Sequence, residues 1–307
     1  MITRREWIRS GVCAAGGVIL AGRLVAADAS FARTESFRAQ MEDLEKTSGG
    51  RLGVAYLDTA HGTRAGYRED ERFPMCSTFK VLAAGKILLR VDHGREHLDR
   101  MVHYTQKEIV SYSPFTATRV GNGGASLREI CVAALTLSDN TAANLMLASI
   151  GGPAAVTAFA RSLGDKVTRL DRTEPALNEA LPGDPRDTTS PAAMVADLQR
   201  LLLGQGLSPG AKTQLAEWMK QCKTGGERLR AGVPADWMVG DKTGSGDRGT
   251  ANDIAILWPP HASPVMVAVY LTQAKAGPAQ RNETIAAVGG AIAALHESLT
   301  PDAFGSR

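Results

Sequence analysis

The sequence predicts an α+β fold of two subdomains: an antiparallel sheet of about five strands, flanked by N- and C-terminal helices, and an inserted all-α subdomain. Three observations support this prediction. Strand-like apolar runs occur near both ends of the chain, the middle has helical periodicity, and a short proline-rich loop joins the last two runs, which favours antiparallel pairing. We therefore expect one sheet built from both ends of the chain, with any active site in the cleft between the subdomains.

The first 29 residues are predicted to be a cleaved export signal. Arg4 and Arg5 precede an apolar run of small residues at 11–22, and the alanines on either side of Asp28 suit a signal peptidase. Paired arginines of this kind resemble a twin-arginine signal, and an ordinary secretory signal is the alternative. The run is shorter than the ~20 residues of a membrane helix, so we expect no stable membrane association after cleavage. We expect the mature protein to be periplasmic or secreted, and to be a monomer.

The composition and the net charge limit the classes of protein to which the chain can belong. Apolar residues make up 44% of the 307 residues, which supports a packed core and excludes a disordered or collagen-like chain. Removing residues 1–27 takes away four of the 35 basic residues and one of the 32 acidic residues, so the mature chain is formally neutral. No basic patch or tail indicates a nucleic-acid partner. With Cys76, Cys131 and Cys222 remaining and no CxxC pattern, we expect no disulfide framework and at least one free thiol.

The sheet subdomain is assigned to residues 30–68 and 219–299. A helix near residues 32–46 comes first, because apolar residues recur there at helical spacing before a Gly-Gly pair. Strands are predicted at 52–57, 65–68, 237–240, 253–258 and 265–272. The chain then ends in a helix and a tail at 300–307, and the apolar stripe of that helix consists of Ile285, Val288, Ile292, Leu295 and Leu299.

The all-α subdomain is assigned to residues 69–218. Helical periodicity runs from about Ser77 to Leu215, with short glycine and proline punctuation, so we expect this segment to be nearly all helical. One boundary is clearly marked, because Ser190 followed by Pro191 is an N-cap with proline at the first helical position. The charged, proline-rich stretch at 172–187 is the exception, since its composition predicts a surface loop.

Ser77 and Lys80 are the first candidates for chemistry. Their i, i+3 spacing makes them neighbours on one face near a helix start, where free backbone N–H groups favour an oxyanion. A helix cap followed by a solvated lysine would give the same pattern. However, the face of Lys80 continues through Ala83, Ala84 and Ile87, which turns the ammonium into the protein. A buried lysine beside a hydroxyl can activate that hydroxyl as a nucleophile.

A second polar motif, Ser138-Asp139-Asn140, follows the apolar run at 131–137. It is either a polar turn with a capping residue or a functional group in which Ser138 passes a proton and Asn140 binds an amide. Sequence position alone does not decide between these interpretations. The decision depends on the other motifs of the chain.

The tripeptide Lys-Thr-Gly occurs twice. The copy at 223–225 ends a helical stretch, where lysine and glycine are ordinary C-terminal features. The copy formed by Lys242, Thr243 and Gly244 leaves the predicted strand at 237–240, and it presents an ammonium, hydroxyls and free N–H groups beside the cleft. We therefore favour the second copy as the functional one.

These three motifs, in this order, resemble those of the penicillin-recognising serine acyl-enzymes. The stretch at 172–187 resembles the Ω-loop that distinguishes class A β-lactamases, and the resemblance covers roughly residues 32–299. It implies hydrolysis of the β-lactam amide of penicillins and cephalosporins through an acyl-enzyme on Ser77, and hence antibiotic resistance. It implies neither a metal nor an organic cofactor.

The resemblance also implies a role for each site residue. The catalytic set is Ser77 as nucleophile, Lys80 or Glu174 as the base in acylation, Ser138 as proton relay to the ring nitrogen, Lys242 as a source of positive potential, and Glu174 as the base in deacylation. The substrate-binding set is Asn140, Asn178, Thr243, Gly244, Ser245, Arg228 and Tyr112, with the N–H groups of Ser77 and Ser245 forming the oxyanion hole. In the loop itself, the resemblance implies a cis Glu174–Pro175 bond and a pair between Arg172 and Asp187.

Two departures from the family pattern change the expected site. Cys131 matches half of a disulfide found in some relatives, but its partner position is Ala84, so that bridge should be absent. The strand position where many members carry a carboxylate-binding arginine corresponds to Ala251. Arg228 matches the alternative position for this arginine, and we expect it to take over.

Several competing interpretations remain open at this point. His93 and His97 could share a metal, but no third ligand stands at a suitable spacing, which favours a solvated face. Cys76 is either a reactive thiol or a small packing residue. A cell-wall D-Ala-D-Ala carboxypeptidase or a non-catalytic β-lactam sensor would share the first motifs, whereas Glu174 with Asn178 favours a hydrolase. Ser245 and Thr173 hint at broader cephalosporin use, but the motifs do not determine the substrate spectrum.

Overall fold

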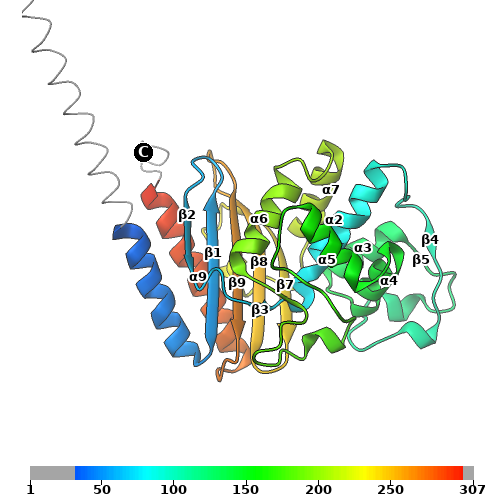
Figure 1. The fold of residues 1–307 in the computed structure, drawn as a ribbon, viewed down its shortest axis with the longest axis horizontal. Helices are drawn as coiled ribbons and strands as arrows, with labels where there is room; N and C mark the ends of the chain where they lie inside the picture. Colours follow the sequence, from blue (N-terminus) through cyan, green and yellow to red (C-terminus); the bar gives the residue numbers. More distant parts are fainter. Residues whose placement is uncertain (1–31, 300–307) are drawn as a thin grey trace, which may run out of the picture.

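The computed structural model describes residues 32–299. They form a β-sheet with helices packed on it, and this sheet lies beside a helical part (Figure 1). The sheet has five antiparallel strands in the order β2-β1-β9-β8-β7. This order places the first strands of the chain directly beside the last, as the sequence predicted, and confirms the α+β class. The predicted export signal at 1–29 and the tail at 300–307 lie outside the described residues. The strands are β1 (Arg51–Asp58), β2 (Arg64–Tyr67), β7 (Met238–Gly246), β8 (Thr250–Trp258) and β9 (Val265–Thr272).

Two long helices cover one face of the sheet. The first spans residues 32–48 and the second is α9 (Pro278–Leu299), and Figure 1 shows them side by side. Strand residues alternate between the two faces: Val267 and Val269 on β9 belong to the core under these helices, whereas Ala268 and Tyr270 belong to the core on the other face. The predicted stripe of α9 is buried through Leu295, while Leu299 is partly buried.

The helical part packs around α2 (Phe79–Asp92), of whose 14 residues nine are buried. N-caps begin several of its helices: Ser126 opens α3, Asp139 opens α4, and Ser190 opens α6, in each case through a side-chain oxygen that accepts a backbone N–H. Among the described residues no single helix is long and apolar enough to cross a membrane, and only α4 and α5, bent as a pair, meet that criterion together. The helices are α2 (Phe79–Asp92), α3 (Leu127–Thr136), α4 (Asn140–Ile150), α5 (Pro153–Ser162), α6 (Pro191–Leu202) and α7 (Pro209–Lys220).

The expectation of a nearly all-helical middle was wrong for residues 93–126 and for residues 163–171 and 188–190, which flank the stretch at 172–187 that was expected to be a loop. Together with that loop, these stretches contain only short 3₁₀ turns and two-residue strands: η2 (Gln106–Glu108), η3 (Thr116–Arg119), η4 (Ala176–Asn178), the pair β4 (Met101–Val102) with β5 (Ala125–Ser126), and β6 (Thr188–Thr189), whose partner β3 (Phe73–Pro74) lies just before the turn that holds Ser77. The physical reason is that side chains satisfy the backbone there in place of a helical ladder. The Asp139 carboxylate, for example, accepts the N–H groups of Phe115 and Thr116, both at 2.9 Å.

Candidate active site

Ser77 lies in a 3₁₀ turn, η1 (Cys76–Thr78), that leads directly into α2. One turn further on, Lys80 is fully buried, as its apolar helix face predicted. Both side chains meet the same atom of the distant residue Glu174. Ser77 Oγ donates to Glu174 Oε1 at 3.1 Å, and Lys80 Nζ lies 3.1 Å from that oxygen. A carboxylate from the irregular part of the chain thus contacts both the hydroxyl and the ammonium.

The remaining contacts of Lys80 lie at the start of α4. Its Nζ donates to the Ser138 carbonyl and to Asn140 Oδ1, both at 2.9 Å, and it lies 3.4 Å from Ser138 Oγ. Burial lowers the pKa of Lys80, and the charge of Glu174 opposes that shift. The lysine therefore releases a proton more readily than a solvated lysine would.

Ser138 links this group to a second buried lysine. Lys242 Nζ donates to Ser138 Oγ at 2.9 Å and to the Thr243 carbonyl at 2.7 Å. Burial, together with the nearby charge of Lys80, lowers the pKa of Lys242 to about 7. The predicted strand at 237–240 ended too early, because β7 remains paired with β8 as far as Gly246, and the motif therefore lies within the strand.

The loop side of the site is formed by Glu174 and Asn178. Asn178 Nδ2 donates to Glu174 Oε2, the carboxylate oxygen that does not contact Ser77. The backbone of Glu174 is held from both sides by Asn144 on α4, which accepts its N–H and donates to its carbonyl, each at 2.9 Å. The bond to Pro175 is cis. Glu174 is therefore fixed by a helix as well as by its own loop.

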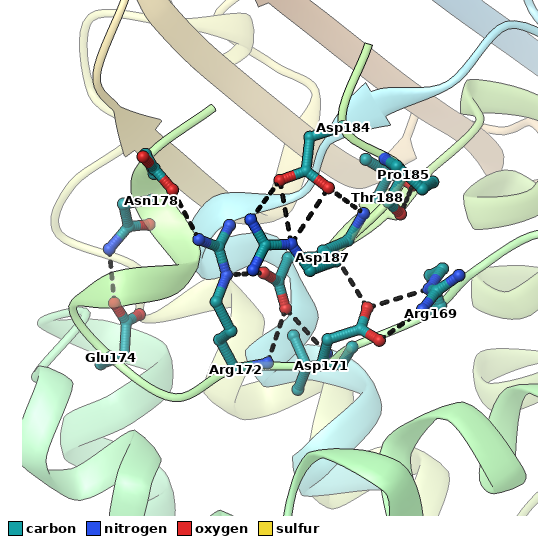
Figure 2. Close-up of polar contacts among 12 residues, drawn as sticks. Arg169, Asp171, Arg172, Glu174, Asn178, Asp184, Pro185, Asp187 and Thr188 are labelled. Carbon is teal, nitrogen blue, oxygen red and sulfur yellow. Dashed lines mark hydrogen bonds and ion pairs between the residues drawn. The ribbon is translucent and has the colours of Figure 1, made fainter. Parts of the chain in front are cut away.

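Figure 2 shows the contacts that close the loop at its neck. Arg172 Nε donates to Asp187 Oδ2 at 2.6 Å, and Arg172 also donates to Glu179 at 2.7 Å. The other oxygen of Asp187 accepts the backbone N–H groups of Asp171 and Arg172. The Asp187 side chain is only 1% exposed. The carbonyl of Asp187 accepts the N–H of Met75 at 2.9 Å, so the neck is connected to the segment before Ser77.

Arg228 reaches the edge of the sheet from the residue preceding α8 (Leu229–Gly232). It donates to the carbonyls of Gly244 and Asn252 at 2.9 and 2.7 Å, and to Ser245 Oγ at 2.8 Å. Burial lowers the pKa of its guanidinium. Ala251 lies opposite Ser245 on β8 and is buried. The cation at this edge thus comes from Arg228.

An open cavity of about 330 Å³ lies over these residues. Tyr112 forms an outer wall and is 61% exposed, and its carbonyl accepts the N–H of Asn140 at 3.0 Å. Lys80, Glu174 and Lys242 lie behind the lining, so that a bound molecule would meet hydroxyls, amides and the Arg228 guanidinium first, and these three charges only through them. The residues that line the cavity are Ser77, Tyr112, Ser138, Asn140, Asn178, Thr224, Arg228, Thr243 and Ser245.

Sequence reasoning missed some residues of this site. Thr224 belongs to the Lys-Thr-Gly copy that we did not favour, yet it lines the cavity and hydrogen-bonds to Thr243. Asn144 was missed as well, although a polar residue within an apolar helical run was a usable signal. Gly244, expected to bind substrate, lies against the nucleophile turn, where a Cβ would come within 2.8 Å of the Met75 carbonyl oxygen.

The structure describes the histidines and cysteines for which two interpretations competed. Among the described residues no group of three or more potential ligands could hold a metal ion, and His93 and His97 are both exposed. Cys76, Cys131 and Cys222 are buried and unpaired, so the expected absence of a Cys131 bridge agrees with the structure. Burial raises the pKa of the Cys76 thiol, which favours the packing interpretation over a reactive thiolate.

Comparisons with known proteins agree with the fold and identify the family. The sequence profile of the beta-lactamase enzyme family matches residues 36–295. β-Lactamase OXY-1 of Klebsiella oxytoca is 45% identical over 284 residues, which cover 92% of this chain and 96% of that protein. β-Lactamase Toho-1 of Escherichia coli is 49% identical over 256 residues, which cover 83% and 88%. The solved class A β-lactamase of the last common ancestor of Gram-negative bacteria, GNCA4, is 59% identical with a TM-score of 0.83, covering 84% of this chain and 98% of that one.

The chain therefore belongs to the class A serine β-lactamases, and it hydrolyses β-lactams.

Proposed function

We propose that β-lactam hydrolysis proceeds in two stages on Ser77. The two buried lysines, Lys80 and Lys242, act in it together with Ser138 and the loop carboxylate of Glu174. In the first stage Ser77 Oγ bonds to the lactam carbonyl carbon, the ring C–N bond breaks, and the serine proton passes to Lys80 or to Glu174. Ser138 delivers a proton to the departing nitrogen, with Lys242 beside it. The observation that carries this proposal is that Glu174 Oε1 lies 3.1 Å from both Ser77 Oγ and Lys80 Nζ.

The second stage uses the loop side of the site. Glu174, oriented by Asn178, accepts a proton from water that attacks the ester carbonyl, so that the acid product leaves and Ser77 regains its proton. A carboxylate within hydrogen-bond reach of the nucleophile is well placed for this step. It is also what a hydrolase needs and a slowly deacylating carboxypeptidase or sensor does not.

The remaining roles concern binding. The N–H groups of Ser77 and Ser245 would stabilise the oxyanion, a contribution typically worth about 3 to 4 kcal/mol for each donor. Thr243, Ser245 and Arg228 would hold the substrate carboxylate, because their donors gather at one edge of the cavity. Asn140 would bind the side-chain amide, and Tyr112 would line the outer wall.

We also propose that the protein acts as a monomer outside the cytoplasm and has no stable membrane association. Export through residues 1–29 is supported by their arginine pair and apolar run, with a twin-arginine route as the specific proposal. Replacing Arg4 and Arg5 together with lysine should leave the protein in the cytoplasm if that route operates. Normal export of this variant would favour the ordinary secretory route.

Turnover of a chromogenic cephalosporin by the purified mature protein tests the proposed function. We expect many turnovers for each active site and a complete loss of activity in Ser77→Ala, which removes the nucleophile. A single stoichiometric burst from the unaltered protein would contradict the hydrolase and would favour a binding protein.

A further inference from the structure

The segment that carries the nucleophile lies across one row of the sheet. Gly244 on β7 pairs with Asn252 on β8, Asn252 pairs with Tyr270 on β9, and Tyr270 pairs with Gly53 on β1. We call these four residues the supporting row. The segment 73–78, which ends in the turn holding Ser77, packs directly against it.

The two glycines of the supporting row allow this close approach. A Cβ at Gly53 would lie 2.4 Å from the Phe73 ring, and a Cβ at Gly244 would lie 2.8 Å from the Met75 carbonyl oxygen. Neither contact is sterically possible, so any larger residue at either position would lift the segment off the sheet. The glycines therefore determine how near the turn comes to β7.

The two polar members of the row hold the segment by hydrogen bonds. Asn252 Nδ2 donates to the carbonyls of Pro74 and Met75 at 2.9 and 3.1 Å. Thr78 Oγ1 donates to the Met75 carbonyl at 2.8 Å. Because the Thr78 hydroxyl has a single proton, the Tyr270 hydroxyl must be the donor in the 3.2 Å contact between the two hydroxyls. Burial raises the pKa of Tyr270, which keeps the phenol protonated. The Met75 carbonyl is thus fixed by donors from two different directions.

The backbone next to Ser77 needs such support. Cys76 has φ of +46°, a left-handed conformation that costs a non-glycine residue of the order of 1 to 3 kcal/mol and persists only where the surroundings enforce it. The same row also binds Arg228, which donates to the carbonyls of Gly244 and Asn252. Ser245, which supplies the second proposed oxyanion donor, directly follows Gly244 in the strand.

We propose that Asn252 and Tyr270 are positioning residues, which set the distance between the nucleophile turn and β7 and thereby align the N–H groups of Ser77 and Ser245. This inference rests on the proposed function, because the oxyanion hole is defined there. Neither residue lines the cavity, and their described hydrogen bonds go to Pro74, Met75 and Thr78, so each acts through the backbone that it holds. The inference extends the active site to a fully buried row of the sheet beneath it.

Three variants test this proposal. Asn252→Leu removes the two hydrogen bonds at similar side-chain size, Tyr270→Phe removes one hydroxyl, and Tyr56→Phe is the matched control. Tyr56 is equally buried in the same sheet and its hydroxyl lies 3.0 Å from His296 Nδ1, but it faces the other core. Acylation rates measured by stopped flow should fall about 10- to 100-fold in Asn252→Leu, since an error near 1 Å in placement costs about that much. Tyr270→Phe should show a smaller decrease and Tyr56→Phe none.

Two further readouts separate positioning from stability. The acyl carbonyl stretch of the trapped acyl-enzyme should move to higher frequency in Asn252→Leu, because weaker oxyanion hydrogen bonds polarise the carbonyl less. If Asn252→Leu does not fold, Asn252→Asp replaces it in the test. The acylation rate of Asn252→Asp, relative to that of the unaltered protein, should rise as the pH falls. The reason is that a protonated carboxyl, unlike a carboxylate, can donate a hydrogen bond to the carbonyls that Asn252 binds.

Failure of this inference can be distinguished from failure of the proposed function. If Ser77 in the unaltered protein is never acylated, the proposed function fails. If Ser77 is acylated normally, and the folded Asn252 and Tyr270 variants acylate at the unaltered rate with the same carbonyl frequency, then the supporting row is only structural and the inference is overturned.

Discussion

The helical side and the loop side of the active site are held in place by different means. Ser77, Lys80 and Ser138 lie at or just before the starts of α2 and α4, and these helices, together with the supporting row beneath the Ser77 turn, fix their relative positions. Glu174 and Asn178 lie in an irregular stretch, where ion pairs and hydrogen bonds from side chains to the backbone fix their positions. The difference suggests a division of labour, in which the rigid side forms the acyl-enzyme and the loop side breaks it down.

On the helical side, the largest effect is expected from Lys80→Met. The change removes one of the two proposed proton acceptors and leaves Glu174 buried without its ion pair, so kcat/KM should fall about 10³- to 10⁴-fold, with a clear loss of stability. Lys86→Met on the same helix is the control, since Lys86 contacts the Phe159 ring and not the site. Steady-state kinetics and chemical unfolding measure both effects, and equal losses in the two variants would contradict the assignment.

On the loop side, Arg172→Ala should act on the second stage. Loss of its contacts to Asp187 and Glu179 leaves a buried carboxylate unpaired, at a cost of about 3 kcal/mol in the free energy of unfolding. Because Glu174 would then be poorly fixed, deacylation should slow about 10- to 100-fold while acylation changes little. Rapid-quench mass spectrometry follows both steps. Arg169→Ala, which removes a more exposed pair with Asp171, should have a much smaller effect on either.

The contrast between the two sides also explains what the sequence could predict. Ser77 and Lys80 were singled out as candidates from residue physics, because i, i+3 spacing and an apolar helix face are local properties, whereas their expected roles came from family resemblance. Four of the five strands were predicted because apolar runs mark them, and the second because Gly62 marks the turn before it, although β7 extends further than its apolar part. The polar end of β7 is held by pairing with β8, which no local pattern shows.

Other features depend on contacts between distant parts of the chain. The charged stretch at 172–187 was predicted from its residues only to be a surface loop; the expected Glu174 role came from family resemblance. Its contact with Ser77 joins residues 97 positions apart. Asn252 had no local signal either, since a buried asparagine in a strand is recognisable only when the carbonyls that it binds are known.

A pH profile can sharpen the comparison between the two lysines. Lys80 has a carboxylate within 3.1 Å, whereas the described contacts of Lys242 are to a hydroxyl and a carbonyl. With its pKa lowered to about 7, Lys242 loses its charge as the pH rises through that value. For substrates with a carboxylate, kcat/KM should therefore fall about tenfold between pH 6 and pH 8. Lys242→Arg keeps its charge, so the same decline in that variant would show that Lys242 is not its cause.

The smallest effect is expected far from the chemistry, at the capping box of α3. Ser126 accepts the N–H of Glu129 while Glu129 accepts the N–H of Ser126. Ser126→Ala should lower the free energy of unfolding by about 1 kcal/mol and leave kcat unchanged. Denaturant titration and steady-state kinetics provide the check. A large loss of activity would mean that the helical side is less rigid than its hydrogen bonds indicate.

The division of labour is tested most directly by the intact mass of Glu174→Ala after mixing with a β-lactam. We expect a rapid mass increase equal to that of the intact β-lactam, located on the peptide that contains Ser77 and persisting long after the unaltered protein has returned to its own mass. Turnover by Glu174→Ala at the unaltered rate, or the absence of any adduct, would contradict the assignment of the two stages to the two sides.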